Sequence, residues 1–342
     1  MTRGKRGGYV YQRGRHSAQR TPHLSYIFDF LSSPESFPAI KEPSDDKSLL
    51  EDIMERNQYL TLEQSENFLL MNFTNKVQLI LDQLVLQSGS FTGCQLEEVR
   101  QIGSFKHGTL IRKPNNVTTG LLADIAVIFK TLPTKEAISQ LSLKLLEDLR
   151  PLCTEEESRT LTYELTDYGF SIINNLMHVN LFVTTLPKNF NSLDPNLHLD
   201  RRICLRNSNA IRHAKWIDDN CVHPSIKVLI RLLKDMRNRF SGFNQLNSWM
   251  INLLAHHSVM NWGKDDPLPL SFAFKRILQL LASGIFLPGC MGLQDPCEDT
   301  MFPVHLQLSL KGLDNICSTA QTLLRALAFG AQKYILGIET VP

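Results

Sequence analysis

Apolar positions in the first half of the chain predict a β-sheet. Short apolar and β-branched runs that are bounded by turn residues are typical of strands. Two such runs flank a Gly103-Ser104 turn, which breaks the first run and begins a helix. The second run carries a single carboxylate, Asp124, among apolar neighbours. The pattern predicts strands over residues 99–102, 121–130, 161–165 and 176–185.

A helical period of about 3.6 residues covers most of the remaining sequence. Thr61 and Gln64 have the spacing of a capping box, and Thr134 is a further N-cap candidate. Gly330 follows the last long helix as its left-handed cap residue. The predicted helices run over residues 45–57, 61–84, 134–150, 197–218, 225–239, 246–261, 270–284 and 313–329.

Three shorter patterns complete this prediction. The acidic residues 155–157 indicate a surface connection between two elements. Residues 304–310 alternate between apolar and polar side chains, which predicts a short strand. In the helix over 61–84, the apolar side chains recur at helical spacing and are predicted to lie in the core. They are Phe68, Leu69, Phe73, Val77, Ile80, Leu81 and Leu84.

The Gly103-Ser104 turn and Asp124 point to nucleotide chemistry. Nucleotidyltransferases bring a turn's N–H groups, its hydroxyl and a helix N-terminus to the triphosphate. The next strand then supplies carboxylates that hold two metal ions. We therefore take Gly103, Ser104, Lys106 and Asp124 as candidates for a vestigial nucleotide site. A tight turn without a ligand is an equally weighted interpretation, because the motif is short and a loop around Gly120 lengthens it.

The carboxylate set of this site is incomplete. Alternate residues of a strand share a face, so a second metal ligand would stand two residues from Asp124. Ala126 occupies that position, and the predicted strand 176–185 contains neither Asp nor Glu. The sequence predicts a transferase frame without catalytic residues and without a metal site.

The order of elements predicts an α+β fold with two lobes. A nucleotidyltransferase-like lobe with a mixed β-sheet covers about residues 44–195, and an α-helical lobe covers residues 196–342. A chain of 342 residues is long enough for both. Residues 1–22 are rich in Gly and Arg and are predicted to be a disordered tail.

Composition excludes several classes of protein. No run approaches the roughly 18 apolar residues of a membrane helix, and the N-terminus lacks the apolar core of a secretory signal. Seven scattered cysteines favour a reducing compartment, so we expect an intracellular protein. Cys290 and Cys297 lack zinc-ligand spacing, and His305 does not complete a site.

The net charge of +2 conceals an uneven distribution. Residues 1–20 hold six basic side chains and no acid, so the other 322 residues hold 30 basic and 34 acidic ones. Arginines on a flexible chain suit RNA contact, and a solubilising tail or nuclear-import patch is the alternative. The candidate nucleic-acid contacts in the tail are Arg3, Arg6, Arg13 and Arg15.

A second basic group lies on the predicted helix 225–239. Lys227, Arg231 and Lys234 are spaced at i, i+4 and i+7 and form one stripe. Such a stripe is a candidate nucleic-acid contact, although a solvated helix face is the favoured interpretation.

Several blocks beyond the Gly103-Ser104 stretch resemble the DZF domain family. These blocks are residues 193–200, 210–216, 226–235, 285–289, 295–298 and 319–323. The resemblance covers most of residues 24–342, and it assigns residues 23–342 to one DZF domain. Taken together, the blocks are similar to the smaller subunit of a nuclear heterodimer that binds RNA and DNA. That subunit continues into an acidic tail, whereas this chain ends at Pro342, so we carry over no function of the tail.

The resemblance implies a catalytically inactive subunit that pairs through its helical lobe. The implied partner is a larger DZF protein with double-stranded-RNA-binding domains or zinc fingers, and the implied ligands are RNA and also DNA. It further implies transcription regulation and RNA metabolism in the nucleus, with the nucleolus and part of the cytoplasm as further locations. No cofactor is required, weak binding of a nucleoside triphosphate and Mg²⁺ is left open, and no membrane contact is expected.

Two alternatives of different classes stay open. An active template-independent nucleotidyltransferase would need other acids, such as Asp167 or Glu97, to reach the metals. An independent RNA- or DNA-binding protein would act through its basic tail and the stripe on helix 225–239.

Overall fold

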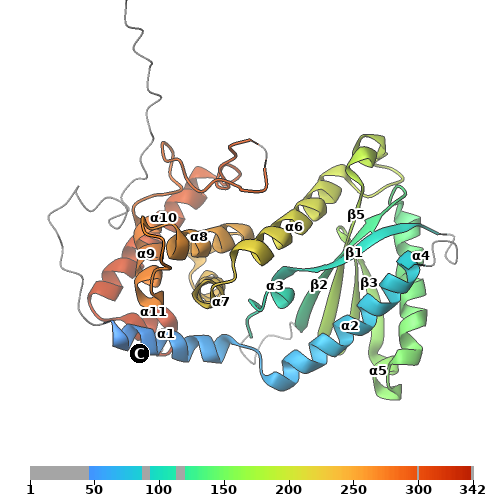
Figure 1. Ribbon diagram of the computed structural model, residues 1–342, viewed down its shortest axis with the longest axis horizontal. Coiled ribbons are helices and arrows are strands. Elements are labelled where there is room, and N and C mark those ends of the chain that lie inside the picture. Colours follow the sequence, from blue (N-terminus) through green and yellow to red (C-terminus); the bar gives the residue numbers. More distant parts are fainter. Residues whose placement is uncertain (1–45, 87–92, 113–119, 299, 340–342) are drawn as a thin grey trace, which may run out of the picture.

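The computed structural model of the chain describes residues 46–86, 93–112, 120–298 and 300–339 (Figure 1). The predicted tail and its four candidate arginines therefore lie outside the described residues, as does most of the loop that precedes Gly120. Among the described residues, no helix is long and apolar enough to cross a membrane.

A mixed five-stranded sheet forms one half of the described protein. Its strand order is β1-β2-β5-β4-β3, and β2 pairs in parallel with β5 while the other pairs are antiparallel. The α+β fold class, with a mixed sheet followed by a helical part, is confirmed. The strands are β1 (Leu96–Ile102), β2 (Leu121–Phe129), β3 (Leu161–Thr166), β4 (Gly169–Asn174) and β5 (Met177–Thr185).

Helices cover both faces of this sheet. On one face, α2 (Gln64–Leu86) and α4 (Lys135–Leu149) pack their apolar sides over Ile125, Val127 and the inner residues of β4 and β5. Thr134 caps α4 as predicted, because its hydroxyl accepts the Ala137 N–H. On the other face, α6 (Arg201–Asn220) packs on β5 and β1. The middle of β2, from residue 125 to residue 127, is therefore buried, whereas Asp124 is half-buried.

The second half of the protein is a helical lobe with its own core. This core is built by α7 (Pro224–Arg239), α8 (Ser248–Met260), α9 (Leu270–Ala282), α10 (Leu310–Ala328) and α11 (Gln332–Leu336). Although it is the first described helix, α1 (Lys47–Leu60) packs against α7, α9 and α11 (Figure 1). The apolar period locates the buried face of such a helix, but it does not reveal the element on which that face packs.

Local capping differs from the prediction at the start of α2. Thr61 ends α1, and its hydroxyl donates to the Asn57 carbonyl instead of capping the next helix. The helix begins at Gln64, where the Glu63 N–H donates to the Glu66 carboxylate. The predicted Thr61–Gln64 capping box is therefore wrong.

Two further predictions are wrong, and a third gains detail. The acidic residues 155–157 lie in a surface connection as predicted, and they begin a short helix, α5 (Glu155–Thr160), with a Thr154–Glu157 capping box. Residues 304–309 form turns that lead into α10, and the neighbours Val304 and His305 are both buried while Leu306 is 60% exposed, which is not the alternating burial of a strand. Phe68 and Leu69 were predicted to be core residues of α2, but they are 59% and 51% exposed.

Candidate functional site

The Gly103-Ser104 turn lies directly against Asp124. Register pairs Ile102 with Asp124 across β1 and β2, and the chain turns into the short helix α3 (Gly103–Lys106) immediately after Ile102. Gly103 has a φ of +79°, and a Cβ atom there would lie 2.2 Å from Asp124 Oδ2. Glycine is therefore required, both for its left-handed backbone and for its close approach to the carboxylate.

Asn180 faces Asp124 from the neighbouring strand. The parallel register of β2 and β5 pairs the two residues, and Asn180 Nδ2 donates to Asp124 Oδ1 at 3.0 Å. Asn180 Oδ1 in turn accepts from Ser171 Oγ at 2.8 Å and from Tyr168 OH at 3.1 Å. The side chain that reaches Asp124 from β5 is therefore an amide, and its orientation is fixed by three hydrogen bonds.

The position of a second metal ligand on β2 is apolar and sealed. Ala126 is fully buried together with Ile102 and Ala214, and α6 covers this small cluster. A water-coordinated metal ion could not reach it without displacing α6. Two-metal catalysis needs carboxylates on both ions, and this face of β2 offers one.

The other acids considered for an active enzyme lie elsewhere. Asp167 is exposed in the turn between β3 and β4, and its carboxylate lies 3.9 Å from Arg206 Nη2. Glu97 follows Leu96, which pairs with Phe129 at the far end of β2 from Asp124. Four or five residues of strand separate that end from Asp124, which corresponds to about 13–17 Å. Neither acid completes a metal pair with Asp124.

A lysine from the helical lobe contacts the Ser104 hydroxyl of this turn. Lys234 Nζ on α7 lies 2.6 Å from Ser104 Oγ and 3.0 Å from the Thr109 carbonyl. Its side chain is only 6% exposed. Burial is the main cause that lowers the pKa of Lys234 to about 7, followed by the positive charge of Arg237.

Two members of the basic stripe on α7, Arg231 and Lys234, thus contact the first lobe. Arg231 Nε donates to Asn57 Oδ1 at 2.8 Å, and its Nη1 contacts the Gly108 carbonyl. Lys227 is half-buried. The interpretation of this stripe as a solvated helix face is therefore wrong for Lys234. Helical spacing alone could not reveal that the stripe joins the two lobes.

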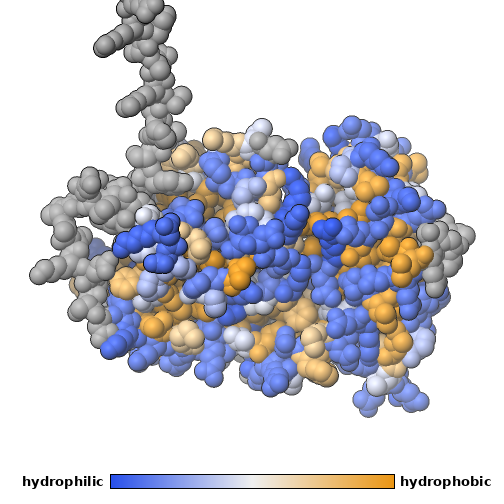
Figure 2. Space-filling view, in the orientation of Figure 1, coloured by the Kyte–Doolittle hydropathy of each residue, from blue (hydrophilic) through white to orange (hydrophobic). Residues whose placement is uncertain are grey.

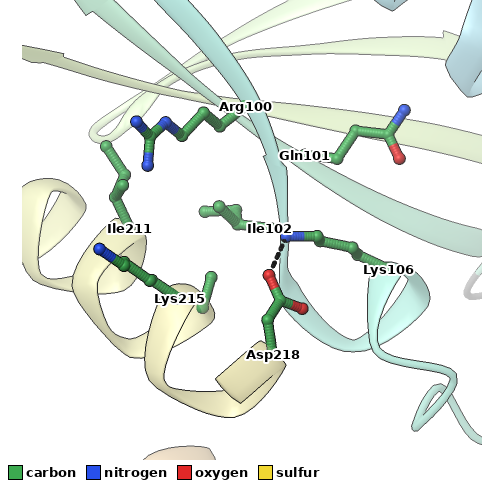
Figure 3. A pocket seen from close by; sticks show the side chains of 8 residues that line it. Arg100, Gln101, Ile102, Lys106, Ile211, Lys215 and Asp218 are labelled. Carbon is green, nitrogen blue, oxygen red and sulfur yellow. Dashed lines mark hydrogen bonds and ion pairs between the residues drawn. The ribbon is translucent and has the colours of Figure 1, made fainter.

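Lys106, the predicted cationic neighbour of Ser104, points to a different place. Its amine pairs with Asp218 near the end of α6 (Figure 3). Asp218 also lies 3.2 Å from Nδ1 of the buried His107. Burial, the largest cause, lowers the pKa of His107 to about 4, so its ring is neutral at pH 7.

Lys106 belongs to a cleft between β1 and α6. The cleft has a volume of about 320 Å³, and Arg100 and Lys215 also point into it (Figure 3). Arg100 pairs with Glu98 and Lys106 pairs with Asp218, so most of the positive charge is already balanced. The cleft could take one small anion beside Lys215, and sequence reasoning missed it because its residues come from distant segments.

The ionisation of Asp124 gives a testable dependence of stability on pH. Burial is the main cause that raises the pKa of Asp124 to about 6, against opposing contributions from Asn180 and Lys234. The protonated form of Asp124 contributes to the stability of the folded protein. This contribution is fully present below the unfolded-state pKa of about 3.9, and it is lost as the pH rises through about 6.

We expect Asp124→Asn to gain stability over the wild type between about pH 4 and pH 6. Asparagine does not titrate, so above that window the variant avoids the cost of a buried charge, which is on the order of 2 kcal/mol. Denaturant unfolding across this pH range measures the difference. A difference that stays constant from about pH 4 to pH 8 would contradict a raised pKa of Asp124.

Comparison with solved structures shows which class of fold the chain has. CdnC of E. coli MS115-1, solved in a complex with HORMA-deltaN, matches with a TM-score of 0.54 and 16% identity, over 85% of this chain and 94% of CdnC. DncV of Vibrio cholerae, a cyclic AMP-GMP synthase, matches with a TM-score of 0.52 and 14% identity, over 81% of this chain and 90% of DncV. The chain has the nucleotidyltransferase fold of these enzymes.

The family follows from the sequence itself. Residues 19–222 match the DZF N-terminal domain, and residues 225–342 match the DZF C-terminal domain. The protein therefore belongs to the DZF family, and the resemblance noted in the sequence is confirmed. The boundary between the two matches falls between α6 and α7, where the chain passes from the sheet to the helical lobe.

Proposed function

We propose that this protein is a catalytically inactive subunit with a nucleotidyltransferase fold. It forms a heterodimer with a larger DZF protein that carries double-stranded-RNA-binding domains or zinc fingers. The pair acts in transcription regulation and RNA metabolism in the nucleus. Nucleolar and partly cytoplasmic locations are compatible with this role, and it involves no membrane.

The pairing of Asp124 with Asn180 carries the proposal of inactivity. The Asn180 atom that faces Asp124 is the amide nitrogen, which donates a hydrogen bond and cannot hold a metal ion, whereas Oδ1 is turned to Ser171 and Tyr168. The other position for a second metal ligand, two residues along β2, is occupied by the buried Ala126, which cannot bind a metal ion. A two-metal mechanism therefore has neither of the additional carboxylates that it needs.

The turn beside Asp124 retains features that suit weak nucleotide binding without turnover. Ser104 offers a hydroxyl at the N-terminus of α3, and the Lys234 amine is within hydrogen-bond distance of it. A phosphate group could exchange for this internal contact. We propose no required cofactor, and any binding of a nucleoside triphosphate with Mg²⁺ would be weak because a single carboxylate holds the metal.

Much of the RNA affinity is expected to come from the partner. Arg231 contacts the Gly108 carbonyl and Lys234 contacts the Thr109 carbonyl of the first lobe, so they are poor candidates for a free phosphate-binding surface. Residues 21–342 carry more acidic than basic side chains, whereas phosphate contacts require a positive field. Direct contact with RNA or DNA is assigned to the four arginines of the tail. Action as an independent nucleic-acid binder through this tail is the alternative.

Exposed apolar side chains on the helical lobe support pairing there. Met301, Leu306 and Leu310 are 90%, 60% and 69% exposed, and they lie within ten residues at the start of α10. The face shown in Figure 2 is a mixture of hydrophilic and apolar residues. Exposed apolar groups gathered in one segment are typical of protein-protein contacts.

Nucleotide incorporation tests the proposed inactivity against the alternative of an active transferase. We expect the full chain to add no labelled nucleotide to RNA or to a second nucleotide, with Mg²⁺ or Mn²⁺ present. An active template-independent transferase assayed in parallel gives the positive control. Metal-dependent incorporation that disappears in Asp124→Ala would establish the active enzyme instead.

A further inference from the structure

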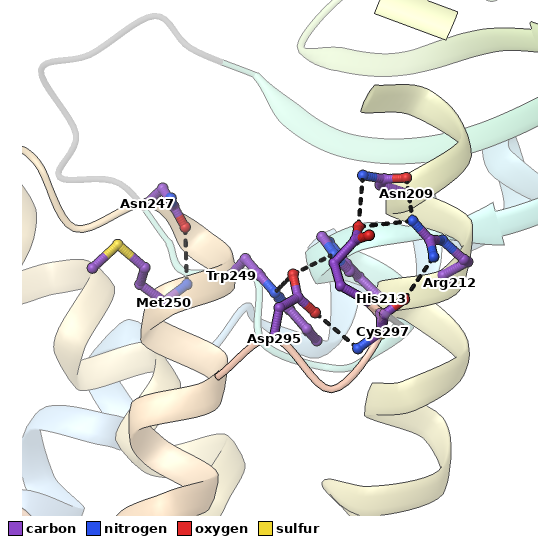
Figure 4. Close-up of polar contacts among 9 residues, drawn as sticks. Asn209, Arg212, His213, Asn247, Trp249, Met250, Asp295 and Cys297 are labelled. Atoms are coloured by element: carbon purple, nitrogen blue, oxygen red, sulfur yellow. Dashed lines mark hydrogen bonds and ion pairs between the residues drawn. The ribbon is translucent and has the colours of Figure 1, made fainter. Parts of the chain in front are cut away.

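Three metal-ligating side chains converge where α6 meets the helical lobe. His213 comes from α6, and Asp295 and Cys297 come from the segment between α9 and α10 (Figure 4). One ligand atom from each of these residues lies within 4.8 Å of the others. This is a mixed nitrogen, oxygen and sulfur donor set, which distinguishes it from an ordinary acidic surface cluster.

Neighbouring contacts hold these ligands in place. Asp295 Oδ2 accepts from Trp249 Nε1 at 2.9 Å, and Asp295 Oδ1 accepts from the Cys297 N–H at 2.9 Å. The His213 ring stacks on Trp249 with a centroid distance of 3.8 Å and an interplanar angle of 6°. Such surrounding bonds fix the orientation of ligands in metal sites.

His213 Nε2 is buried and makes no hydrogen bond among the described residues. Its pair with the Asp295 carboxylate is long, with 3.6 Å between Nε2 and Oδ2, which exceeds hydrogen-bond distance. A tetrahedral zinc ion with Zn–N and Zn–O bonds of about 2.0–2.2 Å separates two such ligand atoms by roughly 3.4 Å. The His213–Asp295 spacing therefore corresponds closely to one edge of a zinc coordination sphere.

We propose that His213, Asp295 and Cys297 form a zinc site that fastens α6 to the segment before α10. Imidazole and thiolate ligands favour Zn²⁺ over Mg²⁺ or Ca²⁺. Three protein ligands leave a fourth position for water or for a ligand from a partner. His213 lies more than eighty residues before Asp295 and Cys297, so no short Cys and His spacing in the sequence indicates this site.

A metal-free arrangement is the competing explanation. The Asp295 hydrogen bonds, together with the Arg212–Glu298 pair at 2.9 Å and the contact of Arg212 Nη1 with the Cys297 carbonyl, could hold the segment without any ion. The two explanations differ in what happens when metal is offered to the full-length protein.

Cobalt(II) titration of the full chain, followed by absorbance, tests the proposal. We expect one equivalent to bind with a near-ultraviolet thiolate charge-transfer band and visible bands of tetrahedral strength, and we expect one equivalent of zinc to abolish them. Cys297→Ser should remove the charge-transfer band, and His213→Gln should reduce affinity at least tenfold. Cys290→Ser is the matched control, because Cys290 is another half-buried thiol of the same segment, and it should leave the spectrum unchanged.

Thermal unfolding provides a second measurement that does not depend on cobalt spectra. Zinc should raise the unfolding midpoint of the wild type and of Cys290→Ser relative to EDTA, and it should leave that of Cys297→Ser unchanged. The absence of a cobalt spectrum, or a spectrum that survives Cys297→Ser in folded protein, would overturn the proposal.

Discussion

Replacing Gly103 by alanine is expected to destabilise the protein by roughly 2–5 kcal/mol. Two costs add at this position. A left-handed backbone costs a non-glycine residue about 1–2 kcal/mol. The new methyl group would also lie 2.2 Å from Asp124 Oδ2, and forcing the carboxylate aside resembles overpacking, which costs about 1–3 kcal/mol. Chemical denaturation of the variant measures the sum.

Gly108 is a matched control for this prediction. It also has a positive φ, +66°, but nothing lies within 4 Å of where its Cβ would be. Gly108→Ala should therefore cost only the backbone term, about 1–2 kcal/mol. Adding Asp124→Ala to Gly103→Ala should recover part of the loss, because the clashing oxygen is gone. Equal losses at the two glycines would contradict the close approach of the turn to Asp124.

The second large effect is expected from Asn180→Asp. This change removes the donor that Asp124 Oδ1 uses and places a second carboxylate in contact with the first. Like charges in a partly buried site oppose each other's ionisation, so we expect a loss of about 2–4 kcal/mol near pH 7 in EDTA. The same change creates the pair of acids that a divalent metal requires. Millimolar Mn²⁺ should therefore restore much of the lost stability.

Asn180→Ala separates these two effects. It removes the hydrogen bond without adding charge, so it should cost about 1–2 kcal/mol and show no response to Mn²⁺. The wild type should respond little to Mn²⁺, because Asp124 alone is a weak ligand. If Mn²⁺ raised the unfolding midpoint of the wild type as strongly as that of Asn180→Asp, the wild type would already contain an intact metal centre, which would contradict this account.

Most elements of the fold could be predicted from periodicity. The longer apolar strands and the amphipathic helices were found because one face of each is continuously buried. The strand β4 was missed because Gly169 and Ser171 interrupt its apolar run, and a turn of two residues joins it to β3. The prediction for segment 304–310 was wrong because a tight turn can alternate in polarity like a strand while burying two neighbouring residues, here Val304 and His305.

The site was predictable only where its residues are close in sequence. Gly103, Ser104 and Asp124 follow from one local motif, and the structure brings them together. Asn180 and Lys234 reach the same place from β5 and α7, which pack beside the motif only after folding. No spacing rule connects a lysine to a serine 130 residues earlier. The partner of Lys106, Asp218 on α6, was hidden for the same reason.

Light scattering after size exclusion tests the central claim most directly. The full chain, of 38.9 kDa, is measured alone and after co-expression with a larger DZF protein that carries double-stranded-RNA-binding domains. We predict a stable one-to-one complex that persists in Asp124→Ala. We also predict that Leu306→Asp with Leu310→Asp weakens it, whereas Leu197→Asp, at a leucine 62% exposed in the first lobe, does not. A well-behaved 38.9 kDa monomer that ignores the partner would contradict the account of this protein as a heterodimer subunit.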